Sequence, residues 1–313
     1  MTRVALFGCG WIQDFHARGV LAHGDELVAV ANHREASARE FAERHGIARV
    51  TTDWEALAAD PEVEAAVVAT PNVLHAPQAI ALLRNGKHVI VEKPMATSVT
   101  ACDDMIAASR DGGALLMVAH CCRFRDEVLA MRERIVAGEL GEIVKTRGYG
   151  VHEKWGPSGW FTDPGLAGGG ALVDMGVHAI DTARFLLGDP QPVRVCATVG
   201  TRYGDYEVDD DGILLITWDD GTNSIVESGW WQPHLAGLEA DTEVYGTGGY
   251  DRIWHFTEGP PGYEHCAQAM YSAQMAAFLD AAARGQQPRP SGEDGLVVMR
   301  VVDEAYRSAA PRD

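Results

Sequence analysis

The chain has 313 residues, which is long for one hydrophobic core and typical of two domains. Hydrophobic residues make up 46% and charged residues 23% of it, as in a water-soluble globular protein. Its 45 acidic and 26 basic residues give a net charge of -19, which repels a phosphate backbone and argues against a nucleic-acid partner.

Residues 1–119 alternate between strand-like and helix-like segments. The strands are short apolar runs without polar alternation, which indicates burial on both faces of a parallel sheet. They cover residues 4–7, 27–31, 65–69, 88–91 and 115–119, and the helical patterns between them include 35–45, 75–85 and 99–110. This alternation predicts a doubly wound α/β domain that binds its ligand at the carboxyl ends of the strands.

The second part of the chain has a different pattern. A helix at 127–137, a strand at 143–151, a loop rich in Trp, Gly and Pro at 155–170 and a helix at 171–187 come first. Strand-like stretches follow at 193–200, 212–218, 224–231, 239–246 and 250–256, and helices at 265–284 and 293–309 close the chain. Consecutive strands with short turns predict a mainly antiparallel sheet in a second α/β domain.

Cysteine usage and hydropathy indicate the compartment. The six cysteines form no C-x-x-C pair, and the adjacent Cys121 and Cys122 suit neither a structural zinc site nor an ordinary disulfide. No stretch approaches the roughly 18 apolar residues of a membrane span, and the first residues lack a signal-peptide pattern. We therefore expect a cytoplasmic protein without a membrane partner.

A glycine turn follows the first strand. Gly8 and Gly10 precede Trp11 and Ile12 at the start of a helical segment. Two glycines at this place let the backbone approach a pyrophosphate at the positive end of the helix. The third glycine of the G-x-G-x-x-G fingerprint is replaced by Gln13, so the turn also fits an ordinary strand–helix connection.

The residues after the second strand bear on cofactor choice. Asn32, His33 and Arg34 stand where an acid would hold the ribose 2′-hydroxyl of NAD. Asn32 can bond a hydroxyl, and the two basic residues can meet a 2′-phosphate, which favours NADP over NAD. Arg34 is equally compatible with a solvated first-turn residue, so the prediction is an NAD(P) site.

Two segments carry candidate proton-transfer groups. Lys93 ends the buried strand at 88–91 in the sequence Glu92-Lys93-Pro94, and proline stops the strand. Further along, Asp174 and His178 lie four residues apart, which places them on one face of a helix. A carboxylate beside an imidazole favours a general base near neutral pH, although such pairs are also common as structural contacts.

The motifs together resemble one family. Gly8-x-Gly10, Thr70-Pro71-Asn72 with His75, Gly86-Lys87-His88, Glu92-Lys93-Pro94 and Gly168–Asp174-x-x-x-His178-x-x-Asp181 occur in this order. The chain is thereby identified as similar to the Gfo/Idh/MocA oxidoreductases over essentially its whole length. The resemblance implies a Rossmann NAD(P)-binding domain at 1–119, a substrate-binding and oligomerisation domain with a large open sheet at 120–292, and a terminal helix at 293–313 that packs on the Rossmann domain.

The resemblance also implies the site. Lys93, Asp174 and His178 are the catalytic residues, acting on the secondary hydroxyl of a sugar, cyclitol or polyol, and no metal is required. Cofactor contacts are expected from Gly8, Gly10, Trp11, Ile12, Asn32, His33, Arg34, Thr70, Asn72, His75, Glu92 and Lys93. Substrate contacts are expected from Asp174 and His178 and, because of their own position and chemistry, from His120, Arg123, Trp155 and Trp160. A homodimer or homotetramer through the second domain's sheet is the implied assembly.

The residues are also compatible with two other functions. A metal-dependent lyase or hydrolase would use Asp174, His178, His152 and Glu153 as ligands, although their spacing matches no specific metal motif. A non-catalytic sensor would bind NAD(P) to report redox state. The substrate's identity, the stereochemistry and the direction of the reaction are not readable from the sequence.

Overall fold

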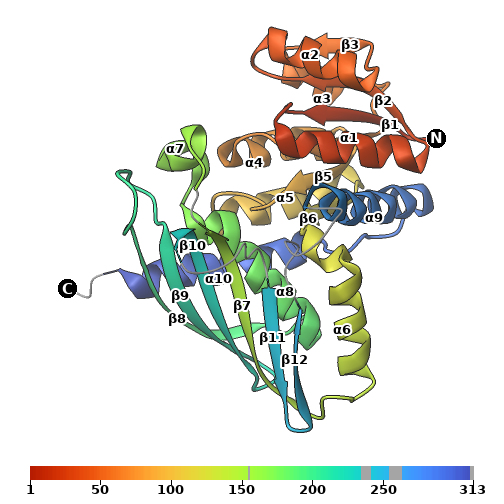
Figure 1. Ribbon diagram of the computed structural model, residues 1–313. Coiled ribbons are helices and arrows are strands. Elements are labelled where there is room, and N and C mark those ends of the chain that lie inside the picture. The colour runs from red at the N-terminus through yellow and green to blue at the C-terminus, as the bar shows by residue number, and fades with distance from the viewer. Residues whose placement is uncertain (154–155, 234–240, 254–262, 311–313) are drawn as a thin grey trace. The chain divides into compact units, whose positions relative to one another are not determined.

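The computed structural model describes residues 1–153, 156–233, 241–253 and 263–310, and the chain divides into two compact units. Met1–Cys121 and Ala267–Leu296 form the first unit, and Cys122–Cys266 and Val297–Asp313 form the second. Each unit contains one six-stranded sheet (Figure 1). The sequence analysis assigned residues 120–292 to the second domain. In the structure, Ala267–Leu296 belong to the first unit, and the rest of the terminal helix belongs to the second.

The first unit contains a parallel sheet in the order β3-β2-β1-β4-β5-β6. Its strands are β1 (Arg3–Phe7), β2 (Glu26–Ala31), β3 (Arg49–Thr51), β4 (Ala65–Val68), β5 (His88–Glu92) and β6 (Leu116–Ala119). Both β4 and β6 are buried along their whole length, as expected for strands covered on both faces. The order is that of a doubly wound sheet whose ligand lies beyond the carboxyl ends of β1 and β4.

Helices connect these strands, as the sequence predicts. They are α1 (Trp11–His23), α2 (Glu35–His45), α3 (Trp54–Ala59), α4 (His75–Arg84) and α5 (Val99–Gly112), with a short 3-10 turn η1 (Asn72–Leu74) before α4. Strand β3 and helix α3 were not predicted. Each is short, and β3 has no buried residue, so neither produces a hydrophobic period.

Helix α9 (Tyr263–Arg284) belongs largely to the first unit and packs on α1. The rings of Phe15 and Tyr271 stack with centroids 5.3 Å apart, and Gln268 Nε2 donates to the Phe15 carbonyl at 3.1 Å. After α9 the chain runs along β6, where the Gln287 amide donates to the Leu116 carbonyl at 2.7 Å. This segment covers the edge of the sheet at β6, which would otherwise expose unpaired backbone groups.

The second unit contains a mixed sheet in the order β12-β11-β7-β10-β9-β8, in which only β7 and β10 pair in parallel. Its strands are β7 (Ile143–Glu153), β8 (Pro192–Gly200), β9 (Asp211–Trp218), β10 (Asn223–Gln232), β11 (Asp241–Gly246) and β12 (Gly249–Ile253). The predicted, mainly antiparallel sheet is therefore confirmed. The expected strand ends at 239–240 and 254–256 lie outside the described residues.

The helical elements of the second unit begin at the short 3-10 turn η2 (Cys121–Phe124), which starts on the last residue of the first unit. They continue with α6 (Asp126–Val136), η3 (Gly159–Thr162), α7 (Pro164–Ala167), a π-helical turn η4 (Leu172–Gly176), α8 (Val177–Leu187) and α10 (Gly292–Ala309). The single helix predicted at 171–187 is thus a π-helical turn followed by α8. Helix α8 lies across one face of the sheet (Figure 1).

Strand β7 approaches η4 so closely that a side chain does not fit between them. A Cβ atom at Gly150 would collide with the backbone carbonyl of Met175. The glycine at this position therefore lets the turn that carries Asp174 rest directly on the sheet. None of the helices in the described ranges combines the length and apolar character that a membrane span needs.

We predict that Gly150→Ala destabilises the protein by about 1–3 kcal/mol, the usual cost of overpacking a tight contact. Gly200→Ala on β8 is the matched control, because its added methyl group meets only the flexible end of Arg202. Urea denaturation of the two variants and the parent chain measures the difference. Equal midpoints for both variants would show that β7 and η4 have room to separate.

Candidate active site

The glycine turn after β1 has the geometry that a dinucleotide needs. Gly8 adopts a φ of +95°, its N–H donates to the Ala31 carbonyl at 2.8 Å, and an added Cβ would strike the Ala69 carbonyl. Gly10 caps α1 with no side-chain hydrogen bond, and a Cβ built there meets nothing within 4 Å. No capping side chain therefore occupies the N-terminus of α1, which is the positive end of the helix dipole.

Gln13 explains how the turn tolerates the missing third glycine. Its side chain is fully buried, and its Nε2 lies 3.5 Å from the Val67 carbonyl on β4. The amide therefore points into the unit rather than toward the open helix end. Trp11, by contrast, is 56% exposed at the start of α1, and Ile12 is half-buried beside it.

The end of β2 presents amide and basic groups rather than an acid. Asn32 Nδ2 donates to the Arg34 carbonyl at 3.1 Å, which fixes the turn, and His33 and Arg34 are exposed. Burial raises the pKa of the Cys9 thiol in the glycine turn, and the positive charge of Arg34 opposes that rise.

His75 joins the loops that follow β4 and β5. Its Nδ1 lies 2.8 Å from the Pro94 carbonyl and its Nε2 lies 2.9 Å from the Thr70 carbonyl, and the ring is 1% exposed. Burial lowers the pKa of His75, so the ring is neutral near pH 7 and donates to one carbonyl at a time. Thr70 also donates its hydroxyl to Gln78 at 2.8 Å, and Asn72 is buried at the start of η1.

Glu92 fixes the backbone at Lys93. One carboxylate oxygen lies 2.8 Å from His16 Nε2 of α1, and the other accepts the backbone N–H of Lys93 at 3.0 Å. Both His16 and Glu92 are buried. The structure thus places Glu92 inside the unit, where its carboxylate holds Lys93 at the carboxyl end of β5.

In the second unit, Asp209 holds the start of the turn that carries Asp174. Its carboxylate accepts the N–H groups of Gly170 and Leu172, each at 2.8 Å, and the hydroxyl of Tyr306 at 2.6 Å. Burial, followed by the charge of Asp209, raises the pKa of Tyr306 well above its usual value. Tyr306 therefore remains a neutral donor, and α10 helps to fix η4.

Asp174 and His178 have different recorded partners, although they are four residues apart. The Trp230 indole donates to Asp174 Oδ2 at 3.0 Å, and His152 Nε2 lies 3.9 Å from the same oxygen. His178 Nδ1 lies 3.6 Å from Cys122 Sγ. Sequence reasoning did not foresee Trp230 or Cys122 here, because both come from distant segments and neither belongs to a local motif.

The other residues predicted to contact the substrate differ in their burial and in their contacts. Arg123 makes a two-pronged hydrogen bond to Asp181, with both distances 2.7 Å, and also pairs with Asp189 at 3.0 Å. It is 4% exposed, and these ion pairs join segments of the second unit. His120 is buried, and Trp160 stacks on Phe161 at 3.8 Å. Trp155 lies outside the described residues, as does the side chain of Glu153.

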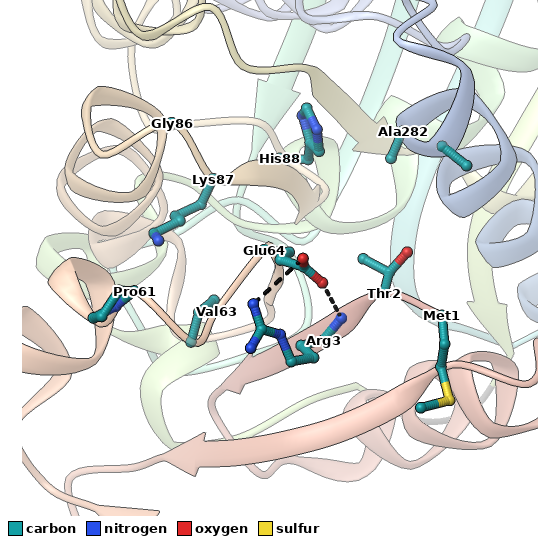
Figure 2. A pocket seen from close by; sticks show the side chains of 11 residues that line it. Met1, Thr2, Arg3, Pro61, Val63, Glu64, Gly86, Lys87, His88 and Ala282 are labelled. Atoms are coloured by element: carbon teal, nitrogen blue, oxygen red, sulfur yellow. Dashed lines mark hydrogen bonds and ion pairs between the residues drawn. The ribbon is translucent and has the colours of Figure 1, made fainter.

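An open pocket of about 530 Å³ in the first unit lies at the wrong edge of the sheet for this chemistry (Figure 2). Its lining includes Arg3, Glu64 and His88, which stand at or just before the starts of β1, β4 and β5. The Arg3 backbone N–H and guanidinium both bind the Glu64 carboxylate, at 2.9 Å and 3.4 Å. Parallel strands place their carboxyl ends at the opposite edge, so this pocket is not the dinucleotide site.

The sheet order, the open α1 terminus and the lysine at the end of β5 define a dinucleotide-dependent oxidoreductase. Comparison with known proteins agrees with this class. Residues 2–120 match the model described as "Oxidoreductase family, NAD-binding Rossmann fold", and residues 128–250 match the "GFO/IDH/MocA C-terminal domain". The chain belongs to the Gfo/Idh/MocA family of oxidoreductases, and its first unit is an NAD(P)-binding Rossmann domain.

Individual relatives cover nearly the whole chain. 1,5-Anhydro-D-fructose reductase of Ensifer adhaerens is 30% identical over 95% of this chain and 92% of its own length. D-xylose 1-dehydrogenase (NADP(+)) 2 of Haloferax volcanii is 30% identical over 93% and 91%. The solved structure of levoglucosan dehydrogenase in complex with NADH and levoglucosan superposes with a TM-score of 0.86, at 26% identity, over 98% of this chain and 97% of the other.

We predict that the buried, neutral His75 makes stability depend on pH. Because its folded-state pKa lies below the unfolded value of about 6.5, the unfolded chain binds the proton first as the pH falls. The free energy of unfolding should therefore decrease below about pH 6.5, with a His75 contribution of at most about 1.4 kcal/mol per pH unit.

His75→Gln removes this contribution and should flatten the curve of unfolding free energy between pH 7.5 and pH 5, measured by urea titration at each pH. His33→Gln is the control, because His33 is exposed and should leave the curve close to that of the parent. The same slope in the parent and in His75→Gln would contradict a buried neutral imidazole.

Proposed function

We propose that this protein is an NAD(P)-dependent dehydrogenase that reversibly oxidises a secondary hydroxyl group of a sugar, cyclitol or related polyol. The observation that carries the proposal is Lys93, held by Glu92 at the carboxyl end of β5 in the NAD(P)-binding unit. The relatives support the substrate class, because their names refer to anhydrofructose, xylose and levoglucosan.

Lys93 and His178 have complementary roles in the proposed reaction. A bound nicotinamide cofactor would supply the hydride acceptor for oxidation of the substrate carbon and the hydride donor for the reverse reaction. His178 takes the proton of the hydroxyl group on that carbon, a role that typically accelerates a reaction by about 10²–10⁴-fold. The ammonium group of Lys93 stabilises the negative charge that develops on the oxygen and orients that oxygen.

Asp174 completes the proposed catalytic set. The sequence left it two roles, either orienting His178 or binding a second substrate hydroxyl. Two contacts support the second role. Asp174 accepts a hydrogen bond from the Trp230 indole, and the neighbour of His178 Nδ1 is the sulfur of Cys122. A carboxylate held by an indole N–H keeps acceptor capacity for a hydroxyl, since each carboxylate oxygen accepts more than one hydrogen bond.

NADP is the cofactor that we propose to be preferred. The turn after β2 offers Asn32, His33 and Arg34, and it carries no carboxylate that would repel a 2′-phosphate. The guanidinium of Arg34 suits that phosphate in charge and geometry. Among the relatives, the Haloferax enzyme is named for NADP(+) and the levoglucosan dehydrogenase complex contains NADH, so the family accommodates both.

The first test of the activity is a panel of sugars and cyclitols supplied with NAD⁺ or NADP⁺, with absorbance of the reduced cofactor as the signal. We expect at least one polyol to be oxidised. On that substrate, Lys93→Met and His178→Gln should each lower kcat by about 10²-fold or more. The Kd of His178→Gln for the oxidised cofactor, measured by fluorescence titration, should remain within about threefold of the parent, because His178 is not among the expected cofactor contacts and the change leaves the N-terminus of α1 intact.

Lys87→Met is the matched control, since Lys87 immediately precedes β5 whereas Lys93 follows it. It should retain the parental kcat. Parental turnover in Lys93→Met and His178→Gln would contradict the assigned roles. A protein that binds cofactor but is inert on the whole panel would instead favour a non-catalytic sensor.

We predict that Arg34→Ala weakens NADP⁺ binding by about 10-fold and leaves NAD⁺ binding within about twofold. The reason is the loss of a charge-assisted contact to the 2′-phosphate, worth about 1.5–3 kcal/mol when fully formed. Arg39→Ala on α2, the helix that begins directly after Arg34, is the control, because Arg39 pairs with Glu35. If Arg34→Ala weakens the binding of NADP⁺ and NAD⁺ equally, Arg34 does not contact the 2′-phosphate.

A further inference from the structure

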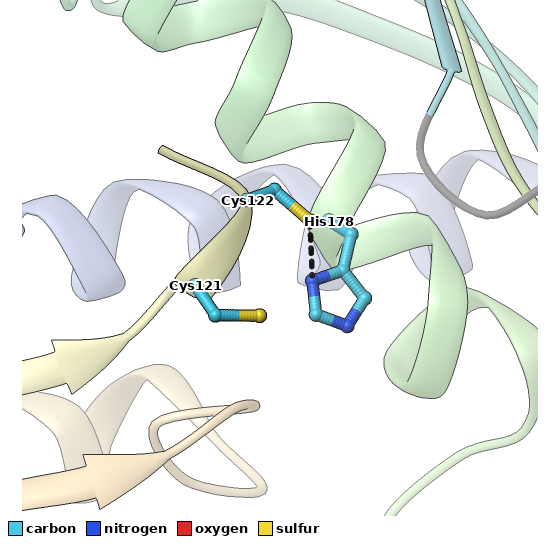
Figure 3. A group of neighbouring side chains, drawn as sticks. All are labelled: Cys121, Cys122 and His178. Atoms are coloured by element: carbon cyan, nitrogen blue, oxygen red, sulfur yellow. Dashed lines mark hydrogen bonds between the residues drawn. The ribbon is translucent and has the colours of Figure 1, made fainter. Parts of the chain in front are cut away.

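A cysteine thiol and the proposed general base form a close pair inside the second unit. Cys122 Sγ lies 3.6 Å from His178 Nδ1, and Figure 3 shows the sulfur directed at this ring nitrogen. Cys122 is 5% exposed and His178 is half-buried. The proposed hydride transfer gives the thiol no part, so the pair needs an explanation of its own.

The separation of the two atoms matches that of two ligands on one metal ion. Zinc binds thiolate sulfur at about 2.3 Å and imidazole nitrogen at about 2.0–2.1 Å, and at a tetrahedral angle these lengths put the two atoms about 3.5 Å apart. The observed 3.6 Å therefore requires almost no rearrangement. A thiol is a weak hydrogen-bond donor, whereas a thiolate is a strong ligand for soft cations.

We propose that Cys122 and His178 bind a thiophilic divalent cation, for which Zn²⁺ is the probe. On binding, the Cys122 thiol releases one proton and its thiolate sulfur bonds the metal, while His178 Nδ1 donates its lone pair. Water fills the remaining coordination positions. Sulfur and imidazole ligands select Zn²⁺ over Mg²⁺ or Ca²⁺.

Such binding has a direct consequence for the reaction, and this consequence rests on the proposed function of His178. A neutral imidazole carries one proton and one free lone pair. When Nδ1 bonds a metal, the ring proton resides on Nε2, so neither nitrogen can accept the substrate proton. Zinc at this pair therefore inhibits the dehydrogenase reversibly, and removal of the metal by a chelator restores activity.

The binding test does not depend on activity. Titration of the full chain with Co²⁺, a spectroscopic substitute for Zn²⁺, should produce the near-ultraviolet sulfur-to-cobalt charge-transfer band of a thiolate ligand. Zn²⁺ should displace it. Cys122→Ser should lose most of the band, and His178→Gln should weaken cobalt binding by at least about 10-fold. Cys196→Ser is the control, because Cys196 is exposed on β8 and should not affect the signal.

No band in the parent chain, or an undiminished band in Cys122→Ser, overturns the proposed site. The consequence is tested separately on the polyol found by the panel. Zn²⁺ should inhibit the parent and Cys196→Ser at least about 10-fold more strongly than Cys122→Ser, each compared with its own metal-free rate. Equal inhibition of all three, or activity that requires zinc, overturns the inhibitory role. If the protein binds cobalt through Cys122 but oxidises no polyol, the result contradicts the proposed function and still supports the metal site.

Discussion

The buried contact between His16 and Glu92 connects the two parts of the first unit on which its chemistry depends. His16 lies on α1, whose open N-terminus follows the glycine turn, and Glu92 ends β5 immediately before Lys93. The carboxylate uses one oxygen for the imidazole and the other for the Lys93 backbone N–H. One buried side chain thus joins the Lys93 backbone to the helix that follows the glycine turn. Loss of either partner leaves a buried polar group unsatisfied, which typically costs about 1–3 kcal/mol.

The second unit uses a buried carboxylate in the same way. Asp209 gathers two backbone N–H groups at the start of η4 and the Tyr306 hydroxyl from α10. Gly150 lets β7 approach the same turn from the other side. Asp174 is thus carried on a turn held at its beginning by hydrogen bonds and along its length by backbone packing. In each unit, a buried acid takes no part in the proposed reaction but positions the segment that carries a reacting group.

Local patterns predicted a parallel sheet with helices in the first part of the chain and a mainly antiparallel sheet in the second, but not the order of the strands, and they missed β3. The resemblance implied the Rossmann fold, and Lys93 was found because a proline ends its buried strand. Partners that are distant in the sequence could not be predicted in this way. The sequence did not indicate that the His75 ring lies between the Pro94 and Thr70 carbonyls, or that Arg123 binds Asp181, 58 residues away. The helical pattern at 171–187 gave no sign of the π-helical turn, since its polar and apolar residues also suit an α-helix.

The contact between Cys122 and His178 shows the same limit, because 56 residues separate the two side chains. The adjacent cysteines matched no metal spacing, and the candidate metal ligands considered from the sequence were carboxylates and histidines. Only the folded unit brings a thiol to the ring nitrogen of the proposed base.

The central claim is hydride transfer from a secondary carbinol carbon to the nicotinamide cofactor. Incubating the protein with NAD(P)⁺ and a substrate polyol deuterated at that carbon, followed by mass spectrometry of the reduced cofactor, tests it most directly. The account predicts that each molecule of reduced cofactor gains one deuterium. Reduced cofactor without deuterium, formed while the labelled polyol is consumed, would contradict it.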